Sequence, residues 1–114
     1  MVREKDIESW LKTKIEAKGG QFFKFISPGQ DGVPDRIAIM PDGRVIFVEL
    51  KTETGVLSAQ QIYQIVRLRR LGQQVCVVFG LKGARDFFDE LERFVVDGGM
   101  YRGDGVVLPM VEGR

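Results

Sequence analysis

The stretch DRIAIMPDGRVIFVELK, residues 35–51, contains two apolar segments joined by a short turn. Residues 35–40 and 44–51 are rich in β-branched and aromatic side chains, which is typical of strands. Between them lies the turn Pro41-Asp42-Gly43, in which Gly43 is suited to a left-handed backbone conformation. The stretch therefore predicts a β-hairpin in which Met40 faces Arg44.

This register brings two acidic residues together. Counting back from the turn, Asp35 faces Glu49, and Lys51 follows on the same face of its strand as Glu49. Facing carboxylates repel each other, which favours a divalent cation between them. In the alternative interpretation, Asp35 ends a turn after Pro34 and Lys51 neutralises Glu49. A two-residue turn would also shift the register by one residue, but the three-residue turn favours the metal site.

The composition limits the chemistry of any metal site. The chain has no histidine and one cysteine, Cys76, which lies in an apolar run and is predicted to be a small buried side chain. Imidazole sites, His-dependent catalytic triads and thiolate clusters are therefore excluded. Oxygen ligands remain, and these favour Mg²⁺, Mn²⁺ or Ca²⁺.

Length and charge indicate one soluble domain. The chain has 114 residues, of which 44% are apolar and 29% are charged. No apolar run approaches the roughly 20 residues of a membrane span, and the N-terminus lacks a secretory apolar region, so a cytoplasmic protein without membrane contact is expected. Residues 1–82 carry 13 Lys and Arg against 9 Asp and Glu, a small excess that is compatible with a polyanionic partner.

Periodicity and end signals predict the order of elements. Ser58 and Gln61 form a capping box at the start of the second helix. The strand–helix–strand unit that follows the hairpin implies a crossover between parallel strands. We therefore expect an α/β fold for a single domain, residues 1–114, with its core in 1–95 and a glycine-rich extension, 96–114, that forms either a hairpin or an irregular tail. The predicted segments are a helix over 3–18, strands over 21–26, 35–40 and 44–51, a helix from 58 to 71, a strand over 73–80 and a helix over 84–95.

A further acid comes from the first helix. Glu4 falls within the apolar stripe formed by Ile7, Leu11 and Ile15, whereas Glu8 lies at the margin of the stripe. Two interpretations of Glu4 fit this pattern equally well. It either reaches a metal held by the neighbouring strands or favours the helix dipole in a frayed first turn.

Together these residues resemble a known family. The stretch GVPDRIAIMPDGRVIFVELKTETGVLSAQQ, residues 32–61, is similar to the VRR-NUC domain, a branch of the PD-(D/E)xK nuclease superfamily. The motifs are a helical Glu, then G-x-P-D, E-x-K and L-S-x-x-Q, and the likeness runs from Glu4 to about Phe79. It implies a restriction-endonuclease-like core, in which a mixed central sheet of about four strands is flanked by helices. The length matches small stand-alone members from bacteriophages and bacteria.

The resemblance implies a role for each motif residue. Asp35 and Glu49 would bind Mg²⁺, or Mn²⁺ in its place, with the backbone carbonyl of Leu50 and the Glu4 carboxylate as further ligands. Lys51 would be the catalytic lysine, which orients water and stabilises charge. Gln60 would be the catalytic glutamine at the start of the helix, near a metal-bound water or a phosphate. The implied activity is hydrolysis of DNA phosphodiesters by a metal-activated water.

The expected substrate contacts come from the loop before Asp35. Ser27, Gly29 and Gly32 in the loop, together with Arg36 and Gln60, are predicted to bind substrate. Small size suggests a homodimer acting on branched DNA such as a four-way (Holliday) junction, in DNA repair or recombination within the bacterial host cytoplasm. The alternatives are a monomeric flap or nicking nuclease, a DNA-binding module that does not cut, and a subunit that docks a partner through its acidic tail.

Overall fold

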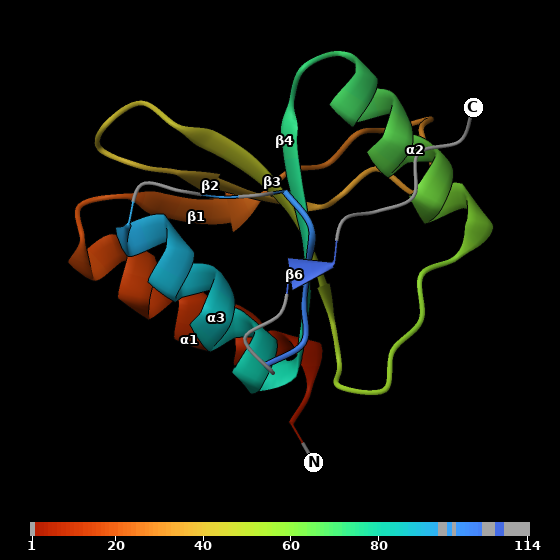
Figure 1. The fold of residues 1–114 in the computed structure, drawn as a ribbon. Helices are drawn as coiled ribbons and strands as arrows, with labels where there is room; N and C mark the ends of the chain where they lie inside the picture. The colour runs from red at the N-terminus through yellow and green to blue at the C-terminus, as the bar shows by residue number, and fades with distance from the viewer. Residues whose placement is uncertain (1, 94–95, 97, 104–106, 109–114) are drawn as a thin grey trace.

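The computed structural model describes residues 2–93, 96, 98–103 and 107–108, and these form helices packed on a mixed sheet (Figure 1). No helix in this part of the chain combines the length and the apolar character needed to cross a bilayer. The elements in chain order are α1 (Glu4–Ala17), β1 (Gln21–Lys24), β2 (Arg36–Ile39), β3 (Val45–Lys51), α2 (Ala59–Arg70), β4 (Gln74–Phe79), α3 (Gly80–Glu92), β5 (Met100–Tyr101) and β6 (Val107–Leu108).

The sheet has the order β1-β2-β3-β4-β5-β6 among the described residues. β1, β2 and β3 are antiparallel neighbours, β3, β4 and β5 are parallel, and β6 returns antiparallel to β5. Helix α2 connects the parallel strands β3 and β4, as the sequence predicts. The mixed sheet flanked by helices is thus confirmed, and it exceeds the expected four strands because the C-terminal segment adds β5 and β6.

The β2–β3 hairpin has the predicted register. Ile37 pairs with Phe47, and the backbone N–H of Met40 donates to the carbonyl of Arg44 at 2.9 Å. Gly43 has a φ of 93°, the left-handed conformation that closes the three-residue turn without a Cβ clash. The turn chemistry therefore fixes which side chains meet at the open end of the hairpin.

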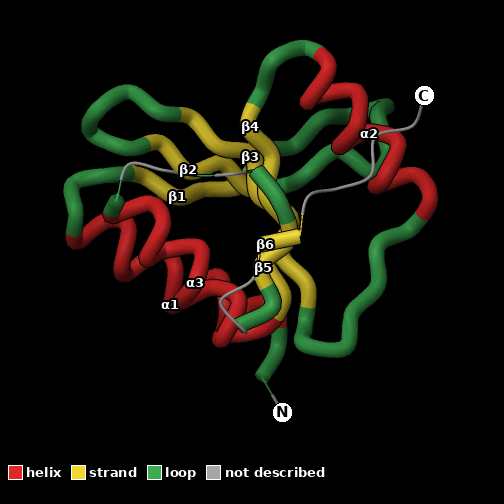
Figure 2. Tube along the Cα trace, viewed as in Figure 1, coloured by secondary structure: helices red, strands yellow, loops and turns green. Residues whose placement is uncertain are grey.

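The helices cover the two faces of the sheet unequally. α1 and α3 lie together on one face and α2 lies on the other (Figures 1 and 2). The larger part of the core packs beneath α1 and α3, and a smaller cluster of Ile65, Val75, Val77 and Phe79 packs beneath α2. The residues that fill the larger core include Ile7, Leu11, Ile15, Phe22, Ile46, Val48, Cys76, Val78, Phe87, Leu91 and Tyr101.

Two boundaries differ from the prediction. Helix α3 begins at Gly80, not at residue 84, because Gly80 adopts a φ of 67° that lets β4 lead directly into the helix. The core also extends beyond residue 95, since Tyr101 in β5 is fully buried and its hydroxyl donates to Glu90 Oε2 at 2.7 Å. The rest of the predicted extension lies outside the described residues, apart from β6.

Candidate active site

Glu49 lies at the centre of the candidate site. Phe47 packs on the cluster beneath α2, and Glu49, two residues further along β3, points to the same face. Glu49 is only 7% exposed. Its Oε2 atom accepts a hydrogen bond from Gln61 Nε2 at 3.1 Å and lies 3.9 Å from Lys51 Nζ. The predicted pair of Glu49 and Lys51 is therefore adjacent, and it is shielded from water by the start of α2.

The surroundings of Glu49 disfavour its charged form. The pKa of Glu49 is raised from 4.5 to about 7, first by burial of its carboxyl group and then by the negative charge of Asp35. The positive charge of Lys51 lowers this pKa, while the negative charge of Glu4 raises it further. With Arg36, which also lowers this pKa, four other charged residues predicted from the sequence thus act on one buried carboxyl group.

Asp35 lies at the mouth of the site. It precedes β2 by one residue, and its carbonyl accepts a hydrogen bond from the N–H of Phe25 at 2.8 Å. Extending the hairpin register by one residue places Asp35 opposite Glu49. The Asp35 side chain is 60% exposed and pairs with Arg36 Nη1 at 3.0 Å. Its carboxylate therefore acts electrostatically on Glu49 and is open to a ligand that enters from solvent.

Arg36 holds the strand start to α1. Its buried guanidinium donates from Nε to Glu8 Oε2 at 2.7 Å and from Nη1 to the backbone carbonyl of Asp35 at 3.2 Å. This arrangement contradicts the prediction that Arg36 contacts substrate, because the side chain points to the α1 face of the sheet and is bound by protein groups. Arg36 instead positions Asp35.

The two acids of α1, Glu8 and Glu4, differ in their contacts. Glu8 is committed to Arg36, whereas Glu4 has no hydrogen bond or ion pair within the part of the chain that the structure describes. Glu4 begins α1, is exposed, and acts electrostatically on Glu49. Of the two, Glu4 is the acid that remains able to bind a ligand at the site.

Gln61 is the residue that the sequence analysis missed. Its side chain closes the predicted capping box, because Oε1 accepts from the N–H of Ser58 at 2.9 Å while Nε2 donates to Glu49. Gln60, predicted as the catalytic glutamine, instead lies beside the backbone of Gly32. The signal was present in the sequence, since the spacing L-S-x-x-Q that starts at Leu57 ends on Gln61 and not on Gln60.

The loop over residues 27–34 is held against α2. Gly32 has a φ of 84° and comes so close to Gln60 that a side chain there would collide with the Gln60 backbone. Gln64 Nε2 also donates to Gln30 Oε1 at 3.4 Å. Gly29, with a φ of 80°, has open space around it, and Ser27 is half-buried. The predicted substrate loop thus lies at the entrance to the site, and its contact with substrate stays a prediction.

The donor chemistry of the site fits a hard divalent cation. Burial and neighbouring negative charge both disfavour an ionised Glu49, and a bound cation would relieve both effects. No three Asp, Glu or Cys side chains in the described residues are grouped so that they could hold a metal ion together. Mg²⁺ does not require one, because it is commonly held by one or two carboxylates and completes its shell with waters and substrate phosphate. Asp35 and Glu49 meet that requirement.

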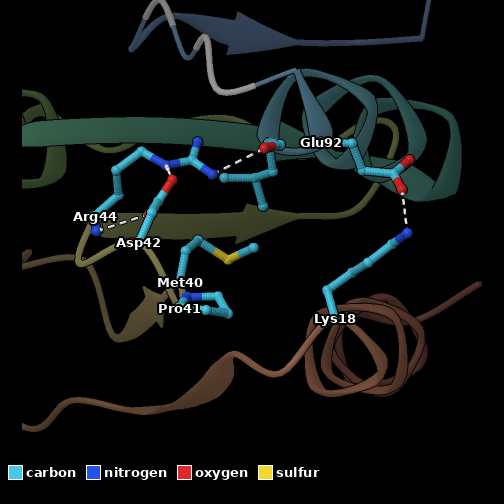
Figure 3. Close-up of a pocket in the computed structure, with 7 residues that line it drawn as sticks. Lys18, Met40, Pro41, Asp42, Arg44 and Glu92 are labelled. Atoms are coloured by element: carbon cyan, nitrogen blue, oxygen red, sulfur yellow. Dashed lines mark hydrogen bonds and ion pairs between the residues drawn. The ribbon is translucent and has the colours of Figure 1, made fainter.

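Another pocket lies at the opposite end of β3 from Glu49, where α1 ends beside the β2–β3 turn (Figure 3). It has a volume of about 510 Å³. Lys18 Nζ pairs with Glu92 Oε2 at 2.8 Å across it, and Arg44 Nε pairs with Asp42 Oδ2 at 2.8 Å (Figure 3). Because these charges pair with one another, the pocket offers no competing candidate for catalysis.

Comparisons with known proteins match the part of the chain that contains the site. The sequence profile of the VRR-NUC domain matches residues 2–80, a range that includes every residue of the candidate site. A protein of Acyrthosiphon pisum secondary endosymbiont phage 1, named "Putative nuclease p44", is 41% identical over 78 residues, which cover 68% of this chain and 84% of the relative. A solved VRR_NUC domain is similar with a TM-score of 0.71 and 29% identity, over 83% of this chain and 100% of that chain.

Proposed function

Because the chain belongs to the VRR-NUC domain family, we propose that it is a metal-dependent endonuclease that hydrolyses phosphodiester bonds in branched DNA such as a four-way junction. The observation that carries the proposal is the buried carboxyl group of Glu49, 3.9 Å from Lys51 Nζ and opposite Asp35 across a hairpin. A structural protein has little use for opposed carboxylates at a strand end, since they destabilise the pair.

The proposed cofactor is Mg²⁺, for which Mn²⁺ would substitute. Asp35 and Glu49 would hold it, and the backbone carbonyl of Leu50 and the carboxylate of Glu4 are the further ligands that the family resemblance implies. When bound, such an ion lowers the pKa of water and neutralises charge on a phosphate.

The side chains of the chain itself perform the remaining tasks. The Lys51 ammonium lies beside Glu49, where it can orient the attacking water and stabilise the negative charge that develops on the phosphate. Gln61 fixes the Glu49 carboxylate through its amide, and Arg36 fixes the Asp35 carboxylate. Both are positioning residues, and their hydrogen bonds limit the conformations that the two acids adopt.

A homodimer is the proposed active form. β1 is an edge strand, and Phe23 in β1 and Val45 in β3 remain 43% and 42% exposed on the sheet face that α2 covers only in part. Apolar side chains at such a surface are suited to a second copy of the chain. A two-fold dimer offers two sites to a two-fold DNA junction. The phage origin of the relative supports action inside a bacterial host cell, in its cytoplasm. The proposed role in DNA recombination or repair follows from the proposed junction substrate.

Cleavage assays test the function directly. The full chain is incubated with plasmid, flap and four-way junction DNA in Mg²⁺, in Mn²⁺ and in EDTA. The matched variants are Asp35→Ala, at the site, and Asp89→Ala, an exposed acid on α3. We expect wild type and Asp89→Ala to cut the junction in either metal, and Asp35→Ala to cut at least about 100-fold more slowly.

Each contrary result identifies one of the alternatives. Preferential cutting of flaps by a monomer would favour a flap nuclease. DNA binding without cutting by any of the three proteins would favour a binding module and overturn the proposed activity. Equal cutting by wild type and Asp35→Ala would show that the chemistry takes place elsewhere.

A further inference from the structure

A second pocket, of about 430 Å³, adjoins the candidate active site. It is lined by Thr52, one residue after Lys51, and by Val2, two residues before Glu4. Phe79, another lining residue, is the register partner of Lys51 across the parallel strands β3 and β4. The pocket and the candidate site are therefore neighbours at the C-terminal ends of β3 and β4.

Positive charge predominates in this second pocket. Lys82 and Arg85 from α3 and Arg102 from the segment after β5 line it, against one acid, Glu53, among the described lining residues. None of the three cations forms an ion pair within the described part of the chain. Unpaired cations gathered in a hollow attract an anion, and the walls of the hollow strengthen that attraction.

The position of Arg102 is fixed by the fold. Its guanidinium carbon lies 3.8 Å from the centroid of the Phe79 ring, a cation–π contact. The chain around Arg102 packs directly on α3, because a side chain at Gly83 would collide with the carbonyl of Tyr101 and one at Gly103 would collide with Lys82. Stacking leaves the N–H groups at the edge of the guanidinium available for an oxyanion.

We propose that this second pocket binds a backbone phosphate of the DNA strand next to the phosphate that is cut. The inference rests on the proposed function and adds to it the residues that place the strand. Lys82, Arg85 and Arg102 would supply the positive charge, and the Thr52 hydroxyl can donate a further hydrogen bond. The pocket includes the first residues of α3, whose backbone N–H groups have no partner within the helix.

Equilibrium binding measures these contacts without relying on cleavage. A fluorescent junction is titrated with the full chain in Ca²⁺ at several salt concentrations. The variants are Lys82→Gln/Arg85→Gln and Arg102→Gln, with Arg93→Gln at the far end of α3 as the matched control. Each lost phosphate contact should reduce the slope of log K against log salt by about one, and the double variant should bind roughly tenfold more weakly.

Two further variants sharpen the test. Glu53→Gln removes the acid of the second pocket, so it should bind DNA more tightly than wild type. Arg102→Gln also removes the stacking on Phe79, so thermal unfolding is measured for each protein. If Arg102→Gln does not fold, the double variant on the exposed face of α3 is used for the test. Equal affinity and salt slope for wild type, the double variant and Arg93→Gln would overturn the proposal.

The two proposals fail in different ways. If wild type cuts DNA while the double variant binds as tightly as wild type, the phosphate site is wrong and the nuclease stands. If binding depends on Lys82 and Arg85 but no DNA is cut, the nuclease is wrong and the phosphate site stands. A junction with a neutral methylphosphonate beside the cut position gives an independent check. When the methylphosphonate replaces the phosphate that occupies the second pocket, wild type should bind the junction more weakly. The same replacement should leave binding by the double variant unchanged.

Discussion

The burial of the Glu49 carboxyl group lowers the stability of the fold. A carboxyl group that is 7% exposed, beside Asp35 and Glu4, loses hydration and faces like charge when it ionises. One cation at 3.9 Å and one amide hydrogen bond offset only part of that cost. A residue that breaks the rules of stable packing in this way is typical of a functional position.

The first prediction concerns the pH dependence of stability without metal. The pKa of Glu49 is about 7 in the folded chain against an ordinary value of 4.5, so the folded state binds more protons between these values. The free energy of unfolding therefore falls as pH rises from about 4.5 to about 7. Glu49→Gln lacks this loss and should be more stable than wild type by roughly 3 kcal/mol above pH 7.

Urea denaturation in EDTA from pH 4.5 to pH 8.5 measures this difference. Glu16→Gln, at an exposed position of α1, is the control for the change in net charge. The stability difference between Glu49→Gln and wild type should grow with pH and level off above about pH 7. A difference that does not vary with pH would contradict the burial of an ionisable group at this position.

The second prediction concerns metal. At pH 8 Mg²⁺ should stabilise wild type, because it binds the ionised carboxylates of the folded chain. At ten times its dissociation constant the gain is about 1.4 kcal/mol. Asp35→Asn and Glu49→Gln should gain nothing, whereas Asp89→Asn should gain as much as wild type. Thermal unfolding with and without Mg²⁺ measures the gain in stability. Equal gains in all four proteins would show that Mg²⁺ binds at another site.

At the scale of elements, local signals were predictive wherever a turn or cap fixes the geometry. The Pro41-Asp42-Gly43 turn determined the hairpin register, and the capping box at Ser58 determined the start of α2. The start of α3 was not predicted, and the antiparallel pair of β5 and β6 was predicted only as one of two alternatives, a hairpin or an irregular tail. β5 has two described residues, too few for any period, and it depends on a close approach to Gly83 that is distant in sequence.

The third prediction separates the two functions of the first turn of α2. Ser58→Ala and Gln61→Ala each remove the capping box and should cost about 1 kcal/mol of stability. Only Gln61→Ala also removes the hydrogen bond to Glu49, so its cleavage rate should fall about 10- to 100-fold while Ser58→Ala stays close to wild type.

Gln60→Ala completes that comparison. It leaves both the cap and the hydrogen bond to Glu49 intact. A loss of cleavage with Gln60→Ala equal to that of Gln61→Ala would restore the catalytic role first predicted for Gln60. Urea denaturation and initial cleavage rates measured on the same protein samples distinguish an effect on folding from an effect on the site.

At the scale of the whole molecule, the site takes its charged residues from the first half of the chain and Gln61 from the start of α2. α1 supplies Glu4, the end of β3 supplies Glu49 and Lys51, and Asp35 stands just before β2. The sequence predicted that these residues lie near one another, because hairpin register and helical periodicity are local rules. It misplaced Arg36, although strand alternation puts this residue on the face opposite Asp35, because its partner there, Glu8 of α1, is distant in sequence.

The last prediction concerns assembly. The wild-type chain should have twice the monomer mass of 12.9 kDa by light scattering. Phe23→Lys with Val45→Lys should reduce the mass to that of the monomer, because two charges are then buried in the interface. Val56→Lys, at an exposed loop position, is the matched control and should remain a dimer.

The oligomeric state should determine how many DNA strands are cut before the protein dissociates. A dimer with two sites should cut both strands of a junction before it dissociates and so linearise a cruciform plasmid, whereas a monomer releases it after a single nick. The Phe23→Lys/Val45→Lys variant should therefore nick the plasmid and accumulate open circles, although Glu49, Lys51 and Asp35 are all present. If the monomeric variant linearises the plasmid as wild type does, paired cutting does not require the dimer, and a monomeric junction or flap nuclease becomes the better description.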